Sequence, residues 1–100
     1  MVKHIVIFKL TPPLAPGEKE ESVRKLKEFF GPVGNRLDYI IEYRTGVNIT
    51  EDDHCGDFVI DATFASREDL KRYQQSDPHR SAVAAAKAIK KAKIVVDYNI

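Results

Sequence analysis

The sequence has little of several residue types, and each scarcity excludes a class of protein. Among 100 residues there is one cysteine, Cys55, so neither an internal disulfide nor an all-cysteine metal site can form. Lysine and arginine number 16 and aspartate and glutamate 15, which leaves a net charge of +1. Proteins that neutralise many phosphates carry a large basic excess instead. No apolar run reaches the length of about 18 residues that a membrane helix needs. We therefore expect no nucleic-acid or membrane partner.

The overall composition indicates one folded domain. Hydrophobic residues make up 43% and charged residues 31% of the chain, as in ordinary globular proteins. A chain of this length builds one hydrophobic core, so we expect a single domain over residues 1–100. The opening ten residues have the composition of a strand and lack a small-residue cleavage site, so no signal peptide is expected. Together with the lone cysteine, this favours a cytoplasmic protein.

Four stretches rich in β-branched and aromatic residues predict strands. They are Lys3–Leu10, Leu37–Ile49, Asp57–Ala65 and Lys93–Ile100. Thr45-Gly46 interrupts the second stretch, and we expect a β-bulge there. The polar loop from Thr50 to Gly56 joins the second and third strands as a hairpin. In the third strand, we expect Asp57 and Asp61 to face away from the core.

Two helical regions lie between the strands. The apolar spacing predicts a helix over residues 18–30. After the third strand, Ser66 is expected to cap a short helix, and Asp77-Pro78 to begin another with Asp77 as its N-cap, running to about Lys91. The side chains expected to be buried are Val23, Leu26 and Phe30 in the first region and Leu70, Tyr73, Val83, Ala86 and Ile89 in the second.

The order β-α-β-β-α-β with right-handed crossovers predicts an antiparallel sheet with both helices on one face, a ferredoxin-like α+β fold. Helices on one face leave the other uncovered. The first and last strands nevertheless have apolar residues on both faces, because Ile5 and Ile7 alternate with Val6 and Phe8, and Val95 is flanked by apolar neighbours. An uncovered apolar face favours a partner. We expect a homodimer in which two sheets pack face to face.

His79 and Tyr73 are candidates for acid–base chemistry. His79 follows Pro78 in the first turn of a helix, where the positive end of the helix dipole lowers the pKa of a histidine and favours a neutral imidazole. Tyr73 lies six residues earlier, and a kink at Asp77-Pro78 could bring its hydroxyl towards the imidazole. A lone histidine near a helix start is more often a surface residue, so the spacing alone favours that interpretation.

His4 and Asp97 lie on the first and last strands. His4 shares a face with Val6 and Phe8, so it points into the space between sheet and helices if that face is the covered one. A half-buried structural histidine is the commoner explanation of such a position. Asp97 could orient a histidine, face a dimer interior or form a salt bridge, and strand alternation does not choose among these.

Other chemistries find no support in the sequence. His54 lies in the acidic loop Glu51–Cys55, but no spacing of a metal site is present, so we interpret the loop as a solvated turn and expect no metal and no cofactor. There is no glycine-rich phosphate loop and no nucleophile elbow. An RNA-binding sheet needs aromatic and basic residues on its open face, whereas Asp57 and Asp61 would repel phosphate.

The ordered set of these segments resembles the stress-responsive α/β-barrel (Dabb) domain family along essentially the whole chain. The segments are Lys3–Leu10, Gly46–Asn48, Asp57–Ile60, Phe64–Ser66, Asp69-Leu70 with Tyr73, Pro78-His79 and Val95–Tyr98. The resemblance implies a dimeric α+β barrel. One member, olivetolic acid cyclase, is a polyketide cyclase that needs no cofactor, and His79, Tyr73 and His4 match its base, its tyrosine and its first-strand histidine. Ser76 stands where the family usually has a further histidine.

Two functions are therefore open. The first is a protein of unassigned activity that binds a small apolar ligand between sheet and helices, in a pocket lined by Val6, Phe8, Val23, Leu26 and Phe58. The second is a cofactor-independent cyclase or lyase acting on a carbonyl or polyketide-like substrate. In the second, His79 is the general base, Tyr73 donates a hydrogen bond and His4 positions the substrate. Because the first helix offers Val23 and Leu26 where the cyclase has aromatic residues, we expect a pocket of different shape.

Overall fold

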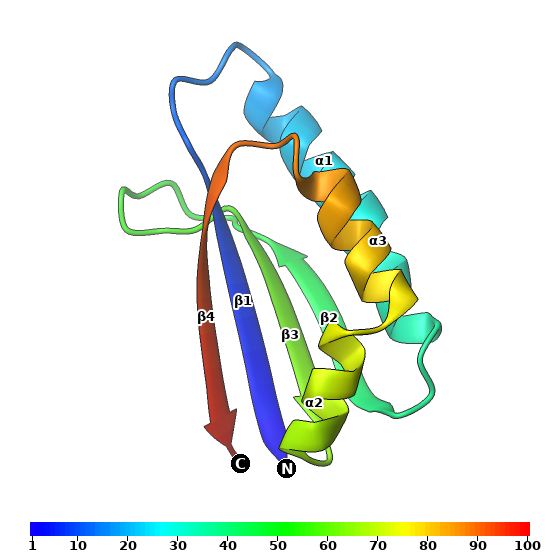
Figure 1. Ribbon diagram of the computed structural model, residues 1–100. Coiled ribbons are helices and arrows are strands. Elements are labelled where there is room, and N and C mark those ends of the chain that lie inside the picture. Colours follow the sequence, from blue (N-terminus) through cyan, green and yellow to red (C-terminus); the bar gives the residue numbers. More distant parts are fainter.

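The computed structural model describes residues 1–100 and contains a four-stranded sheet covered on one face by helices (Figure 1). The strands are β1 (Val2–Leu10), β2 (Ile40–Val47), β3 (Phe58–Phe64) and β4 (Lys91–Asn99). The helices are α1 (Glu18–Phe30), α2 (Arg67–Gln74) and α3 (Asp77–Ala86), with a 3-10 turn η1 over Gly31–Asn35. The sheet order is β2-β3-β1-β4, with all neighbours antiparallel. The predicted ferredoxin-like α+β fold is confirmed.

The covered face of the sheet and the helices above it form one core. Alternation along β1 and β3 sends every second side chain towards α1, as predicted. The buried apolar side chains include Val6, Phe8 and Leu10 of β1, Val23, Leu26 and Phe30 of α1, Phe58, Ile60 and Phe64 of β3, and Leu70 and Tyr73 of α2. Burial of a large apolar side chain contributes about 1.5–3 kcal/mol relative to exposure. This cluster therefore fixes the sheet against α1 and α2.

No helix covers the opposite face of the sheet (Figure 1). Ile5 and Ile7 of β1 lie beside Val96 and Ile94 of β4 on this open face. The exposed fractions of Ile94, Val96 and Tyr98 are 59%, 50% and 49%. The prediction that the first and last strands are apolar on both faces is confirmed, and the chain alone leaves the open-face side chains of β4 exposed to water.

Asp57 is buried, although the alternation in the sequence predicts that it faces away from the core. It immediately precedes β3, and its Oδ2 atom accepts a hydrogen bond of 2.7 Å from the backbone N–H of Leu10. Its Oδ1 atom lies 3.3 Å from Nζ of Lys19. The carboxylate therefore connects the end of β1 to α1, which explains why an acidic residue occupies this position.

The last helix is shorter than predicted, and of the side chains expected to be buried Ala86 is buried but Val83 is not. It ends at Ala86, and Lys91, the predicted helix end, begins β4. Nζ of Lys91 donates to the carbonyl oxygens of Ala86 at 2.7 Å and Ile89 at 3.1 Å, which satisfies carbonyls left free at the helix end. Ala82 and Ala86 are buried, whereas Val83 is 47% exposed. The small side chains let α3 approach α1 closely, a feature that hydrophobicity alone does not predict.

Strand β2 is shorter than the predicted Leu37–Ile49, and its irregularity lies elsewhere. The register with β3 shifts between Ile40 and Glu42, whereas Thr45-Gly46, the predicted bulge, pairs regularly. Bulges are frequent on edge strands such as β2. Gly46 serves a close approach instead, because a Cβ atom there would lie 3.1 Å from Cγ1 of Val59.

Candidate functional site

The break between α2 and α3 places His79 against Tyr73. Ser76, not the predicted Asp77, caps α3: its hydroxyl accepts from the backbone N–H of His79 at 3.3 Å and donates to the carbonyl oxygen of Tyr73 at 2.6 Å. The same hydroxyl therefore ends one helix and begins the next. The ring centroids of Tyr73 and His79 are 4.6 Å apart. The predicted kink brings the two side chains together.

The hydrogen bonds of His79 define which ring nitrogen is free. Nδ1 lies 3.1 Å from the carbonyl oxygen of Gln74. A carbonyl only accepts, so Nδ1 carries the hydrogen, and Nε2 of the neutral ring is left as an acceptor. Burial lowers the pKa of His79, the Gln74 hydrogen bond opposes this, and the charges of His4 and Lys93 lower it further. The main cause of the lowered pKa is therefore burial.

Tyr73 is completely buried, and its hydroxyl has no hydrogen-bond partner. Its ring lies 5.2 Å from that of Phe64 and 6.2 Å from that of Tyr43, centroid to centroid. Burial raises the pKa of Tyr73 to about 12, although the nearby Tyr43 opposes the rise. The Tyr43 hydroxyl donates to the carbonyl oxygen of Phe30 at 2.8 Å and makes no hydrogen bond to Tyr73. The Tyr73 hydroxyl is thus a protonated donor without a protein acceptor.

His4 lies on the covered face of β1, next to Tyr73. It is 3% exposed, and its ring centroid is 6.0 Å from that of Tyr73. The β1–β4 register places Asp97 opposite His4, and Nδ1 of His4 lies 2.5 Å from Oδ1 of Asp97. Of the three roles open to Asp97 from the sequence, the structure supports the orientation of a histidine, and that histidine is His4.

The sequence did not single out Tyr43, and it left Asp97 undecided. The ring of Tyr43 packs directly against Gly34, because a Cβ atom at Gly34 would lie 2.5 Å from Cδ1 of Tyr43. Glycine at this position therefore permits the ring to lie over η1 and against Tyr73. Asp97 and His4 are 93 positions apart in the chain, and they meet only because of the register of β4 on β1. No local sequence pattern encodes that register.

The side chains predicted to line an apolar pocket are packed together instead of surrounding an opening. Val6, Phe8, Leu26 and Phe58 all belong to the buried core, and the ring of Phe8 lies 6.5 Å from that of Phe58. None of these four lines the groove between α2 and β4, the groove beside α1 or the groove around Cys55. Val23 does line a groove, between α1 and the residues that follow β2.

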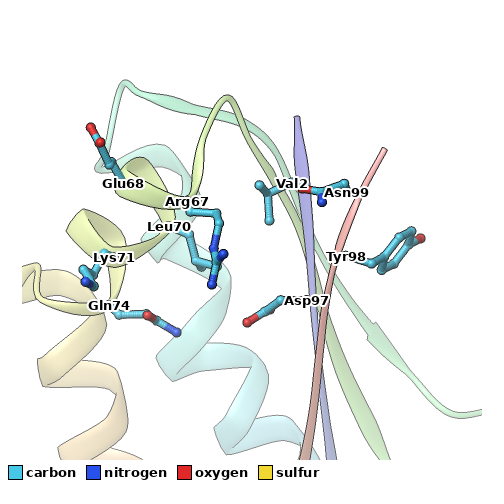
Figure 2. A pocket seen from close by; sticks show the side chains of 9 residues that line it. All are labelled: Val2, Arg67, Glu68, Leu70, Lys71, Gln74, Asp97, Tyr98 and Asn99. Carbon is cyan, nitrogen blue, oxygen red and sulfur yellow. The ribbon is translucent and has the colours of Figure 1, made fainter.

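A groove of about 500 Å³ lies between α2 and β4, beside the histidines (Figure 2). Its lining comprises Val2, Arg67, Glu68, Leu70, Lys71, Gln74, Asp97, Tyr98 and Asn99. Gln74 accepts from His79 through its main-chain oxygen, and Asp97 binds His4. Two residues of the groove wall therefore contact the two histidines directly, although the rings of His79 and Tyr73 are not part of the wall.

The structure contains neither a cluster of metal-ligating side chains nor a helix suited to span a membrane. No group of three or more histidine, cysteine, aspartate or glutamate side chains is placed to hold a metal ion. His54 is exposed, and its backbone N–H donates to Oδ1 of Asp52 at 2.8 Å, as in a turn. No helix combines the length and apolar character needed to cross a membrane.

Comparison with known proteins agrees with this architecture. An uncharacterized protein of Streptomyces coelicolor is 29% identical over 84 residues, or 84% of each chain. A dimeric ferredoxin-like protein of unknown function from Bacteroides fragilis is 25% identical, with a TM-score of 0.86 over 99% of this chain and 95% of that one. A hydroxynitrile lyase from Passiflora edulis is 17% identical, with a TM-score of 0.76 over 99% and 92%. The model of the stress-responsive A/B barrel domain (Dabb) matches residues 2–100, and the chain belongs to that family.

Proposed function

We propose that this protein binds a small molecule beside His79 and Tyr73 and moves a proton on it without a cofactor. The observation that carries the proposal is the proximity of the ring of Tyr73, whose buried hydroxyl has no partner, to the imidazole of His79, whose Nε2 is free to accept. An unsatisfied buried hydroxyl costs about 1–3 kcal/mol. A bound molecule with an oxygen acceptor at Tyr73 would remove that cost.

The chemistry follows from the protonation states of the two groups. His79 is neutral at physiological pH because its pKa is lowered, so Nε2 can take a proton from a carbon or hydroxyl next to a carbonyl or nitrile group. Tyr73 keeps its own proton and can donate a hydrogen bond to the oxygen that becomes negative. His4, held by Asp97, would position the substrate from the β1 side. General-base catalysis of this kind contributes about 10²- to 10⁴-fold.

A lyase or cyclase is the reaction type that this arrangement suits best. The fold neighbour from Passiflora edulis is described as a hydroxynitrile lyase, and its similarity of 17% identity supports the fold rather than the reaction. A second candidate is the binding of a small apolar ligand without chemistry. The aromatic surroundings of Tyr73, formed by Phe64 and Tyr43, favour this candidate. In either case we place the ligand at Tyr73, because the core around Phe8 and Phe58 is filled.

The active form in this proposal is a homodimer in the cytoplasm. The exposed side chains of Ile94, Val96 and Tyr98 form an apolar surface on the open face, and stacking two such faces would remove it from water. The Bacteroides fragilis relative is a dimer. The sheets would pack together and leave the helices, and with them His79, on the outside of the assembly.

The test is proton abstraction from nitrobenzisoxazole, a probe that needs only a base. Removal of its ring proton breaks the N–O bond and gives a nitrile and a coloured phenolate, whose oxygen can accept from Tyr73. We expect the wild-type protein to exceed free imidazole at equal concentration and His79→Gln to lose about 10²-fold of the rate. His54→Gln, the same change at an exposed loop histidine, is the control. Equal rates for the two variants would contradict the proposal.

The non-catalytic candidate gives a different pattern. A pure binding protein would not accelerate the reaction, but the phenolate product would still perturb the NMR signals of residues around Tyr73. Tyr73→Phe would then weaken the binding of that product, whereas the rate would not exceed that of imidazole in any variant. The two candidates are therefore separated by the rate and not by binding.

A further inference from the structure

The groove between α2 and β4 has two walls of different chemistry. The sheet wall comprises Val2 and Asn99 near the chain ends, with Asp97 below them, whereas the ring of Tyr98 points away from α2 on the other side of β4 (Figure 2). The helix wall presents residues one turn apart along α2 (Figure 2). The guanidinium of Arg67 points down into the space between the walls, and the carboxamide of Gln74 extends into it from the other end of the helix.

The free charge in this groove is positive. Arg67 and Lys71 lie four residues apart on α2, and neither forms an ion pair or side-chain hydrogen bond within the chain. Glu68, on the same helix, points away from the space between the walls (Figure 2). The one carboxylate on the sheet wall, that of Asp97, is already engaged by His4 at 2.5 Å. An incoming anion would therefore meet the unpaired guanidinium of Arg67 and one carboxylate that has its own partner, whereas the unpaired Lys71 lies on the side of α2 away from β4 (Figure 2).

We propose that this groove is a subsite for the carboxylate group of a small organic acid, with Arg67 as the residue that selects it. A guanidinium binds a carboxylate through two parallel N–H···O bonds, and Lys71 adds a second positive charge one turn away. The amide of Gln74 supplies a neutral donor. A phosphate dianion suits the groove less well, because its second negative charge would lie near the carboxylate of Asp97 in the groove wall.

The position of the groove connects this subsite to the proposed chemistry. Gln74 binds His79 through its main-chain oxygen and lines the groove, and Asp97 lines the groove and binds His4 through its side-chain Oδ1. A molecule anchored at Arg67 would thus extend along Gln74 towards His79 and Tyr73. The subsite deepens the proposed function by naming the substrate class, a carboxylic acid that has its reactive carbonyl or hydroxyl at the far end.

Binding of two matched probes tests the subsite without any chemistry. Benzoate carries the carboxylate, and benzamide has the same size and shape without the charge. Each is titrated into uniformly labelled protein and followed by amide NMR shifts. We expect benzoate to shift the amides of the groove, centred on α2 and the end of β4, and to bind about tenfold more tightly than benzamide, as the loss of one charge-assisted hydrogen bond implies.

Three variants make the test specific. Arg67→Gln should weaken benzoate binding about tenfold and remove the preference over benzamide, and Lys71→Gln should weaken it less. Arg80→Gln on α3 is the control, because Arg80 is an exposed arginine without an ion pair that does not line the groove. Thermal unfolding checks that each variant is folded. Equal affinity for the two probes, shifts centred away from the groove, or equal weakening by Arg67→Gln and Arg80→Gln would overturn the proposal.

The outcome is independent of catalysis. If nitrobenzisoxazole is not turned over but benzoate binds as expected, the proton-transfer function fails and the carboxylate subsite stands. If His79 acts as a base but Arg67→Gln does not weaken benzoate binding, the carboxylate subsite is wrong and the proton-transfer function stands.

Discussion

The rings of Tyr73 and His79 lie 4.6 Å apart, centroid to centroid, although the two residues belong to different helices. Ser76 makes this contact possible. Its hydroxyl donates to the carbonyl oxygen of Tyr73 at the end of α2 and accepts from the backbone N–H of His79 at the start of α3. Burial leaves the Tyr73 hydroxyl as a donor without an acceptor, and the Gln74 carbonyl leaves Nε2 of His79 as an acceptor without a donor. The pair is complementary to a molecule that supplies both partners.

The lowered pKa of His79 predicts that acid destabilises the fold. Between the lowered pKa and the ordinary value of about 6.5, the unfolded chain binds a proton that the native state does not, so stability rises with pH there. This contribution is full above about pH 6.5 and is lost as the pH falls towards the folded pKa. Urea unfolding gives the free energy of unfolding at about pH 5 and about pH 7.5. The difference between these two values should be smaller for His79→Gln than for the wild type. His54→Gln should keep the wild-type difference.

Removal of the Tyr73 hydroxyl should not destabilise the protein. Tyr73→Phe deletes a buried group that has no hydrogen bond, so we expect the free energy of unfolding to stay equal or to rise by up to about 1 kcal/mol. Tyr43→Phe is the matched change, and it should cost about 1 kcal/mol because it removes the hydrogen bond to Phe30. A loss of stability in Tyr73→Phe as large as that in Tyr43→Phe would mean that the Tyr73 hydroxyl has a partner.

The His4–Asp97 pair should contribute to the stability of the fold. Asp97→Asn keeps the shape but removes the charge beside a buried imidazole, and we expect it to cost about 1–3 kcal/mol of unfolding free energy. Asp38→Asn, at an exposed position without an ion pair, should change it by less than about 0.5 kcal/mol. Urea unfolding of both variants measures the two changes in the free energy of unfolding. A cost in Asp97→Asn no larger than that in Asp38→Asn would show that the carboxylate does not stabilise His4 in its place.

A single charge on the open face should prevent dimerisation. Val96→Lys places an ammonium group in the middle of the proposed sheet–sheet interface, where it would lose its hydration, so we expect a monomer by light scattering after size-exclusion chromatography. Val83→Lys is the control, because Val83 is similarly exposed, at 47%, but lies on α3. Dimers of unchanged stability in Val96→Lys would place the interface elsewhere.

Most of the fold follows from local patterns in the sequence. Helix α1 has the predicted bounds because charged and apolar residues alternate at helical spacing and Gly31 begins a different turn. Ser66 caps α2 through a hydrogen bond of 3.1 Å from the N–H of Asp69, as its position before acidic residues predicts. The two-sided apolar pattern of β1 and β4 correctly predicts an open face. Each of these features depends on residues within one or two turns of each other.

The candidate site was predictable only in part. The kink expected at Asp77-Pro78 does bring Tyr73 and His79 together, whereas the place of His4 beside them was implied only by the family resemblance. The apolar pocket expected around Phe8 and Phe58 is instead a filled core, because alternation indicates which way side chains point but not whether they leave a space.

The sequence by itself determined the order of elements, the caps and the two faces of the strands, because backbone propensity and apolar periodicity act between near neighbours. Tertiary structure alone decided the partner of His4, the end of α3 at Ala86 and the orientation of the His79 ring. Asp97 meets His4 only through the register of β4 on β1, and the free nitrogen of His79 is defined by a carbonyl in the preceding helix. Such contacts depend on how whole elements pack, and packing is determined by burial summed over the chain rather than by any local segment.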